Sequence, residues 1–186
     1  MTRARGWLIG ELWLDLKMIL PVCNRSLTLR NVLWAMFACD GFILLMMFRT
    51  RQWCRRHHIP VVNRVMRLME TALFAIELAN DAELGHGVYF MHTVGTVIGG
   101  DSKLGDGCIL LGSITLGQAT QQGYPQVGAR TVIGAGARLL GKIEIGADCA
   151  IGANAVVVDH VPEAKVALGV PARVVGDNPN RLPVRP

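Results

Sequence analysis

The sequence is poor in charged and aromatic residues, and its cysteines show no pairing pattern. Of its 186 residues, 18% are charged, 6% are aromatic and 51% are hydrophobic. So apolar a chain is not intrinsically disordered, and its glycines lack the three-residue period of collagen. The five cysteines include no CxxC pair, which argues against a disulfide framework and fits a reducing compartment. No arginine–aromatic pattern indicates nucleic acid binding.

The sequence also lacks a secretory signal and a long uninterrupted apolar run. Charged residues interrupt the apolar segment MTRARGWLIGELWLDLK. The most apolar stretch, residues 32–48, has Asp40 and Gly41 in its middle, which favours a buried helix pair over a membrane span. We therefore expect a cytoplasmic protein. Peripheral association with the inner face of a membrane stays open because basic residues follow the stretch: Arg49, Arg51, Arg55 and Arg56.

The residues that are abundant are sorted into two regions. Residues 1–75 carry 11 basic and 4 acidic residues, whereas residues 76–186 carry 8 and 10. Eighteen of the 21 glycines lie between Gly85 and Gly176, while all four tryptophans lie in the first region. A uniform domain would not divide in this way. We predict a helical N-terminal region over residues 1–75, a second domain over 76–176 and a tail over 177–186.

The first region has the spacing of helices. Apolar residues at helical intervals end at Pro21, and Pro60 suits the first turn of a further helix. After Pro60, two apolar stripes run side by side, and we expect their methionines to pack in a core rather than to bind a cofactor. The stripes are Val61, Val65, Leu68 and Ala72, and Val62, Met66, Met69 and Leu73.

The second region is a six-residue repeat. Aliphatic residues recur every six positions, often followed by glycine, and one shift of eleven residues separates two runs. The first run is Ile98, Leu104, Leu110 and Leu116; the second is Val127, Ile133, Leu139, Ile145, Ile151 and Val157. Such a grid predicts a mainly β chain folded as a parallel β-helix of roughly five coils. The glycines are expected at corners, where the backbone needs a positive φ or a close approach.

Two insertions interrupt the grid. FMHTVG, residues 90–95, adds two residues before Ile98, and QATQQGYPQ, residues 118–126, adds five. An insertion into a solenoid forms a loop, and loops carry function. We therefore expect the chemistry of the molecule near these two segments.

These segments resemble the hexapeptide-repeat acyltransferases, in the branch of the serine O-acetyltransferases and related polysaccharide O-acetyltransferases. The similarity rests on GVYFMHTVGTVIG, LLGSITLG, VIGAGARLLGKIEIGADCAIGANAVVV and the closing VPEAKVALGVPARVVG. The resemblance implies a left-handed β-helix, a homotrimer, and acetyl-CoA bound between neighbouring subunits. It also implies that the helical region mediates further assembly, such as a dimer of trimers.

The resemblance further implies that His92 is catalytic and that Glu77, fifteen residues earlier, orients it. Acyl transfer to an alcohol requires a base for the attacking hydroxyl, and an imidazole with a pKa near 7 suits this task. A carboxylate on the other ring nitrogen would fix the tautomer and stabilise the imidazolium. The alternatives are a loop histidine and a solvated carboxylate at a strand edge.

For the coenzyme, the resemblance implies backbone contacts from small residues on successive coils, here Ala135, Gly136 and Ala153. Arg173 and Lys142 are candidates for the nucleotide phosphates, since a guanidinium is a bidentate donor. The alternatives are corner geometry for the small residues and solvated charge for the basic ones. No metal site is expected, because His86, His92 and His160 lack the spacing of a zinc site.

The sequence departs from the serine acetyltransferases where these bind the charged groups of serine. The expected Arg-His pair of the long loop falls on Gly123 and Tyr124, and two acidic positions fall on Met91 and Ser26. A zwitterion without charged partners binds poorly. We therefore predict transfer to a sugar hydroxyl in exopolysaccharide or capsule biosynthesis, with Tyr124, Gln121 and Gln126 at the acceptor. The alternatives are a serine O-acetyltransferase of cysteine biosynthesis and a non-enzymatic β-helical scaffold.

Overall fold

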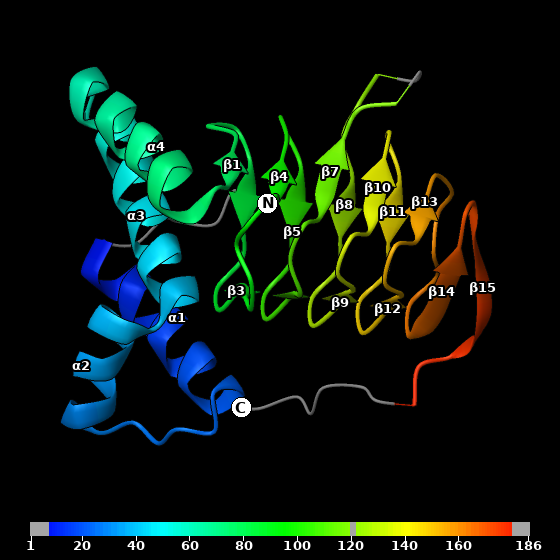
Figure 1. The fold of residues 1–186 in the computed structure, drawn as a ribbon, viewed down its shortest axis with the longest axis horizontal. Coiled ribbons are helices and arrows are strands. Elements are labelled where there is room, and N and C mark those ends of the chain that lie inside the picture. Colours follow the sequence, from blue (N-terminus) through cyan, green and yellow to red (C-terminus); the bar gives the residue numbers. More distant parts are fainter. Residues whose placement is uncertain (1–7, 120–121, 180–186) are drawn as a thin grey trace.

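The structure is a computed structural model that describes residues 8–119 and 122–179, and it has two parts side by side (Figure 1). Four helices form one end, and a rod of short parallel strands extends from them. The helices are α1 (Leu8–Val22), α2 (Leu29–Ala38), α3 (Asp40–Arg56) and α4 (Pro60–Phe74). The helices thus end at Phe74 and the first strand begins at Glu77, close to the division predicted at residue 76.

The ends of the helices follow from local chemistry. The Thr28 hydroxyl caps α2 by accepting a hydrogen bond from the Asn31 backbone nitrogen. Pro60 occupies the first turn of α4, and Ala75 ends this helix in the left-handed conformation. The apolar stretch 32–48 breaks at Cys39, and α2 and α3 meet there at 78°. Within the described residues, no single helix is long and apolar enough to cross a membrane, whereas this bent pair passes by length and composition.

Helix α4 corrects one expectation. Its apolar stripes were predicted to pack in a core, but within this chain they face outward: Val61 is 72% exposed, Leu73 66% and Met69 45%. The fully buried residue of α4 is instead a carboxylate, Glu70. Glu70 points at α3, where it meets the Arg51 guanidinium, whereas the opposite face of α4 is exposed in the described part of the chain.

Buried ion pairs fasten the helices to the rod. The Arg49 guanidinium donates to both carboxylate oxygens of Asp15, at 2.9 and 3.1 Å, and to the carbonyl oxygens of Leu84 and Gly85. Burial raises the pKa of Asp15, but hydrogen bonds from His86 and Arg49 outweigh it, so the pKa is lowered overall. Removing one partner of such a pair leaves an uncompensated buried charge, which is strongly destabilising.

A second buried pair joins α3, α4 and the first coil. Arg51 lies 3.3 Å from Glu70, between Nε and Oε1, and donates to the Leu78 carbonyl oxygen and to Asn80. Burial raises the pKa of Glu70 to about 6, against the opposing charge of Arg51. The position of α4 beside the rod therefore depends on one carboxylate in a costly environment.

The rod is a three-sided prism. Sheet A contains β1, β4, β7, β10 and β13; sheet B contains β2, β5, β8 and β11; sheet C contains β3, β6, β9, β12, β14 and β15. Neighbouring strands are parallel and in register, except for the antiparallel pair of β14 and β15. The strand bounds are β1 Glu77–Leu78, β2 Glu83–Leu84, β3 Tyr89–Phe90, β4 Val97–Ile98, β5 Lys103–Leu104, β6 Ile109–Leu110, β7 Thr115–Gly117, β8 Gln126–Val127, β9 Val132–Ile133, β10 Arg138–Leu140, β11 Glu144–Ile145, β12 Ala150–Ile151, β13 Val156–Val157, β14 Lys165–Gly169 and β15 Ala172–Asp177.

The core of the rod is the aliphatic grid of the sequence. Ile98, Leu116, Leu139 and Val157 are stacked in sheet A by consecutive strand pairs, and all are buried. Burying each such side chain contributes about 1.5–3 kcal/mol. The glycine after the aliphatic residue allows the coils to approach: a Cβ at Gly105 would lie 2.5 Å from the backbone nitrogen of Ala129. The predicted repeat is confirmed residue by residue, and close approach is what requires glycine there.

Candidate active site

Two edges of the prism carry the predicted functional residues, and we name them by the sheets they join. The C–A corner consists of residues 91–96, 111–114, 134–137 and 152–155, which follow strands of sheet C and precede strands of sheet A. The A–B corner consists of residues 79–82, 99–102, 118–119, 122–125, 141–143 and 158–160. Both predicted insertions lie on these corners, one on each.

His92 lies on the C–A corner, directly after β3. The backbone nitrogen of Met91 donates to Leu110, which holds the start of the turn against the next coil. On that next coil, Gly112 has a φ of 114°. A Cβ on this glycine would lie 2.8 Å from the Cβ of His92. Glycine is therefore required at position 112 for two reasons: it tolerates the positive φ, and it leaves room for His92 at the surface of the rod. His92 and Met91 are both exposed.

The small residues predicted to bind the coenzyme continue along the same corner. The backbone nitrogen of Gly136 donates to Gly112 (3.0 Å), and that of Asn154 donates to Ala135 (2.8 Å). Ala153 stands beside Asn154 on the next coil, and Ala135 and Ala153 are exposed. One edge of the rod thus presents His92 on its first coil, Ala135 and Gly136 on its third and Ala153 on its fourth.

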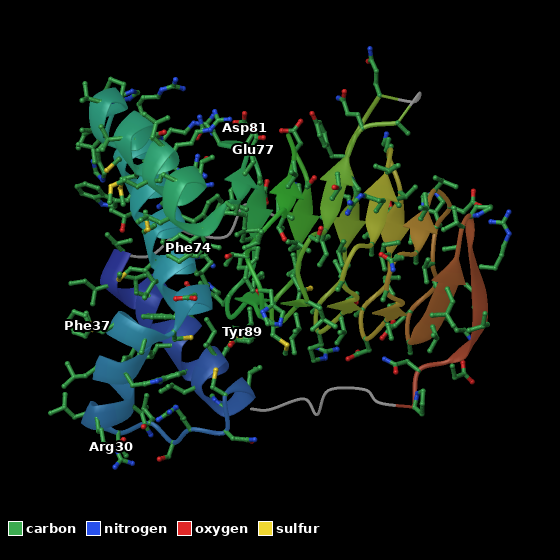
Figure 2. All side chains as sticks on the ribbon, viewed as in Figure 1. Arg30, Phe37, Phe74, Glu77, Asp81 and Tyr89 are labelled. Atoms are coloured by element: carbon green, nitrogen blue, oxygen red, sulfur yellow. The ribbon has the colours of Figure 1, made fainter. Side chains whose placement is uncertain are left out.

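Glu77, the predicted partner of His92, is engaged elsewhere. It begins β1 and points outward beside α4, as Figure 2 shows. Its Oε1 lies 3.0 Å from Nη2 of Arg67, and both side chains are partly exposed. In the part of the chain that the structure describes, Glu77 makes no hydrogen bond to His92. Sequence reasoning missed Arg67, because its approach to Glu77 depends on how α4 packs.

The remaining predicted residues that the structure describes lie on or beside the A–B corner. The Tyr124 ring covers Gly99 and Gly100, so closely that a Cβ on Gly100 would lie 2.0 Å from the ring. Gln126 donates to the Asp101 carbonyl oxygen of the same corner (3.2 Å). Lys142 lies against Gly123. Gln121 lies outside the described residues.

Arg173 reaches the same corner from the last strand. It pairs with Asp159 at 3.1 Å, and both side chains are largely exposed. Arg173 and Lys142 are therefore separated from Ala135, Gly136 and Ala153, which lie on the C–A corner. A single chain does not bring the two sets of predicted coenzyme contacts together.

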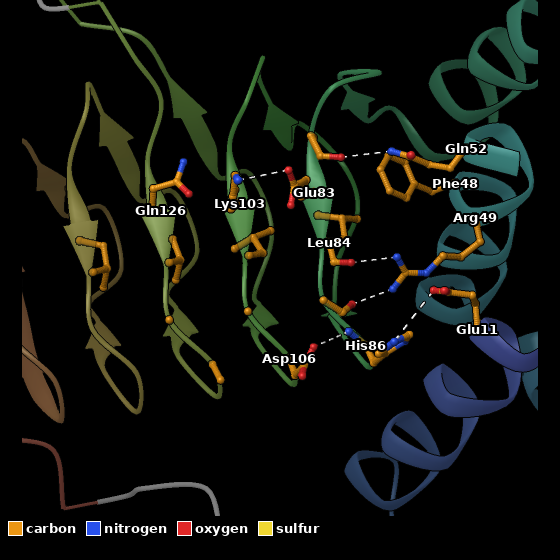
Figure 3. A pocket seen from close by; sticks show the side chains of 18 of the residues that line it. Glu11, Phe48, Arg49, Gln52, Glu83, Leu84, His86, Lys103, Asp106 and Gln126 are labelled. Carbon is orange, nitrogen blue, oxygen red and sulfur yellow. Dashed lines mark hydrogen bonds and ion pairs between the residues drawn. The ribbon is translucent and has the colours of Figure 1, made fainter. Parts of the chain in front are cut away.

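A large groove runs along sheet B, away from His92. Its volume is about 820 Å³, and it lies between the rod and helices α1 and α3 (Figure 3). Arg49 closes one end through its bonds to Leu84 and Gly85, as Figure 3 shows. Of the predicted site residues that the structure describes, Gln126 alone lines this groove. Among the described residues, no group of three or more histidine, cysteine or acidic side chains could hold a metal ion.

Comparison with known proteins identifies the family to which this fold belongs. Residues 124–159 match the bacterial transferase hexapeptide (six repeats) family. The serine acetyltransferase of Helicobacter pylori (strain J99) is 30% identical over 149 residues, which cover 78% of this chain and 87% of that protein. The chain belongs to the serine acetyltransferase family. The predicted left-handed β-helix behind N-terminal helices is thereby confirmed.

Other members of the family are longer than this chain. The serine acetyltransferase of Synechococcus elongatus is 33% identical over 157 residues, which cover 83% of this chain but 64% of that protein. A serine acetyltransferase from Brucella abortus strain S19, solved in complex with coenzyme A, superposes with a TM-score of 0.79 and 26% identity. The superposition covers 91% of this chain and 68% of that one. The chain thus spans about two thirds of the length of these two family members.

Proposed function

We propose that the protein is an acetyl-CoA-dependent O-acetyltransferase in which His92 acts as the general base. The observation that carries this proposal is the C–A corner, where His92 lies in line with Ala135, Gly136 and Ala153. Family membership and the relative solved with coenzyme A support the same cosubstrate. A corner of small residues leaves backbone groups accessible to a long, thin ligand beside an exposed imidazole.

The reaction follows from the chemistry of the two substrates. His92 removes the proton of the acceptor hydroxyl as the oxygen attacks the thioester carbonyl carbon, and a tetrahedral intermediate forms. Collapse of this intermediate breaks the carbon–sulfur bond. The imidazolium then returns its proton to the departing thiolate, so that free coenzyme A and the acetyl ester leave with His92 neutral.

We propose that Glu77 orients His92 during this cycle. For this role its side chain must turn from Arg67 toward the imidazole. An exposed ion pair such as Arg67–Glu77 is worth about 0.2–1 kcal/mol, so its rupture is a small barrier. The carboxylate would then hold the ring tautomer that presents an unprotonated nitrogen to the acceptor.

We propose a homotrimer as the active form. Lys142 and Arg173 lie on the A–B corner, whereas His92 and the small residues lie on the C–A corner. In a threefold assembly of prisms, the A–B corner of one chain can face the C–A corner of its neighbour. Such an arrangement would supply cations for the coenzyme phosphates and bring Tyr124 toward His92 of the adjoining subunit.

For the acceptor, L-serine is the candidate that the relatives favour, since they are serine acetyltransferases. The predicted sugar hydroxyl is the second candidate. It is favoured by Met91, an exposed apolar neighbour of His92, and by Tyr124, an aromatic ring of the A–B corner that packs against Gly99 and Gly100. The carbohydrate prediction thus has local support but no support from the relatives.

Replacement of His92 tests the proposal. In His92→Asn we expect kcat to fall about 10²–10⁴-fold, because general base catalysis is lost while the shape of the side chain is kept. Thiol release from acetyl-CoA measures the rate, with L-serine and with neutral sugars as acceptors. His57→Asn, at an exposed position directly after α3, serves as the control. Unchanged turnover in His92→Asn would sink the assignment.

The scaffold alternative has a separate test. A coenzyme site on the folded chain predicts that millimolar acetyl-CoA raises the melting temperature, since ligand binding stabilises the native state. A β-helix that serves only as a scaffold predicts no shift. Differential scanning calorimetry with acetyl-CoA distinguishes the two.

A further inference from the structure

A second cavity, away from the sheet B groove, lies where α3 and α4 meet the first coil of the rod. Its volume is about 460 Å³. Its polar lining comes from the end of α3, the first turns of α4 and the A–B corner, and consists of Arg55, His58, Asn63, Arg64, Arg67 and Asn80. Three guanidinium groups and an imidazole therefore surround one small space.

The cavity has more positive than negative charge. Two carboxylates reach its rim: Asp81 pairs with Arg55 at 2.5 Å, and Glu77 pairs with Arg67 at 3.0 Å. Figure 2 shows Glu77 and Asp81 at this edge of the rod, beside α4. Within the described residues, Arg64 forms no ion pair. The lining itself contains no acidic residue.

The N-terminus of α4 adds to this positive character. Ile59 precedes the helix and makes no side-chain cap, and the first turn contains no acidic residue. Ile59, Pro60 and Asn63 line the cavity, but Pro60 has no N–H and the N–H of Asn63 donates to the Ile59 carbonyl oxygen (3.3 Å). The contribution of this terminus is therefore the positive end of the helix dipole, which favours an anion.

Arg67 connects the cavity to the candidate active site. It lines the cavity and binds Glu77, the carboxylate that the proposed function assigns to His92. An anion bound among the arginines would compete with Glu77 for Arg67. Glu77 would then be free to turn toward His92.

We propose that this cavity binds an anionic group, carboxylate or phosphate, carried by the hydroxyl acceptor, and that Arg67 is its central donor. The inference rests on the proposed function and adds the class of acceptor. The cavity supplies the positive charge that the loop around Tyr124 lacks. The carboxylate of serine and the phosphate of an activated sugar share this chemistry, whereas a neutral sugar has no use for the cavity.

Binding of simple anions tests the site itself. We expect inorganic phosphate and acetate to raise the melting temperature of the wild type and of Arg30→Gln by the same amount. Arg30 is the control because it lies on α2, far from Glu77 in Figure 2. In Arg64→Gln and Arg67→Gln the shift should be smaller, and in the double variant it should be lost. Equal shifts in all variants would overturn the site.

Kinetics test the link to the acceptor. With L-serine or a sugar phosphate, we expect Arg67→Gln to raise the acceptor KM at least tenfold while the KM for acetyl-CoA stays within twofold. Arg67→Lys should restore part of the affinity. The acceptor that the wild type acetylates identifies the source of the anion. Turnover of a neutral glycoside at a rate unaffected by Arg67→Gln would overturn the inference, although the proposed O-acetyltransferase would stand.

The binding and kinetic experiments together distinguish failure of the proposed function from failure of the cavity assignment. If no acceptor is acetylated but phosphate binding still depends on Arg64 and Arg67, the proposed function fails and the assignment of the anion to an acceptor fails with it. If His92-dependent acetylation occurs without anion dependence, only the cavity assignment fails.

Discussion

At the scale of single residues, His92 owes its exposed position to a glycine on the next coil. Gly112 has both a positive φ and no room for a side chain, so the corner can curve under His92 without touching it. The insertion around His92 was visible in the sequence as a fault in a regular grid. The pairing of Glu77 with Arg67 was not visible in the sequence. Arg67 lies ten residues earlier, on a helix whose packing angle is not specified by any local pattern.

Replacement of this glycine should damage the site before the fold. In Gly112→Ala the new methyl group would press on His92, and a residue held at such a φ costs about 1–3 kcal/mol. We expect a lower melting temperature and a fall in kcat of at least tenfold. Gly117→Ala is the matched control, because a Cβ there meets its nearest atom at an ordinary 3.5 Å. If both variants were equally active, the contact between Gly112 and His92 would be unimportant.

At the scale of elements, the rod was predictable and the helical layer was only partly so. A six-residue period determines which residues pack together, since each aliphatic residue stacks on its counterpart one coil later. The break at Cys39 and the start of α4 at Pro60 also follow from local signals. The face that α4 turns inward does not, because Glu70 is buried only in the presence of Arg51 on another helix.

This buried carboxylate should give the fold a pH dependence. The folded-state pKa of Glu70, about 6, exceeds its ordinary value of 4.5, so protonation favours the native state. The stabilisation is complete below pH 4.5 and is lost as the pH rises through 6. The shift corresponds to about 2 kcal/mol.

Chemical denaturation of wild type and Glu70→Gln at several pH values measures this effect. The free energy of unfolding of the wild type should fall by about 2 kcal/mol more than that of the glutamine variant between pH 4.5 and 7. The other carboxylates titrate in both proteins and cancel in the difference. A difference that does not vary with pH would contradict the assignment.

At the scale of the whole molecule, one face of the helical layer is apolar and exposed in the described part of the chain. Val61, Val65 and Leu68 of α4 are each about half exposed or more. A monomeric protein rarely exposes so continuous an apolar surface. The sequence pattern alone suggested an internal core for these residues. We now expect an interface between copies of the chain, in keeping with the predicted role of the helices in assembly.

Charged residues introduced on this face should therefore reduce the number of chains in the assembly and leave the fold of the rod unchanged. We expect Val65→Glu combined with Leu68→Glu to reduce the mass of the particle in light scattering, for instance from a hexamer to a trimer. Far-ultraviolet circular dichroism should be unchanged. Val175→Glu, on an exposed position of β15, provides the control. An unchanged mass in the α4 variant would remove the helices from the interface.

The two ends of the rod differ from its middle, and this difference limits how the molecule can grow. At one end α3 and α4 pack on the first strands, and at the other β15 turns back antiparallel on β14. A parallel solenoid with open ends offers unpaired backbone groups to any similar edge, which invites fibre formation. Here the reversed strand presents the wrong polarity to a further coil, and the helices occupy the opposite edge. End-to-end pairing of strand edges is thereby opposed, so we expect copies of this chain to associate through the flanks of the rod or through the outer face of the helices.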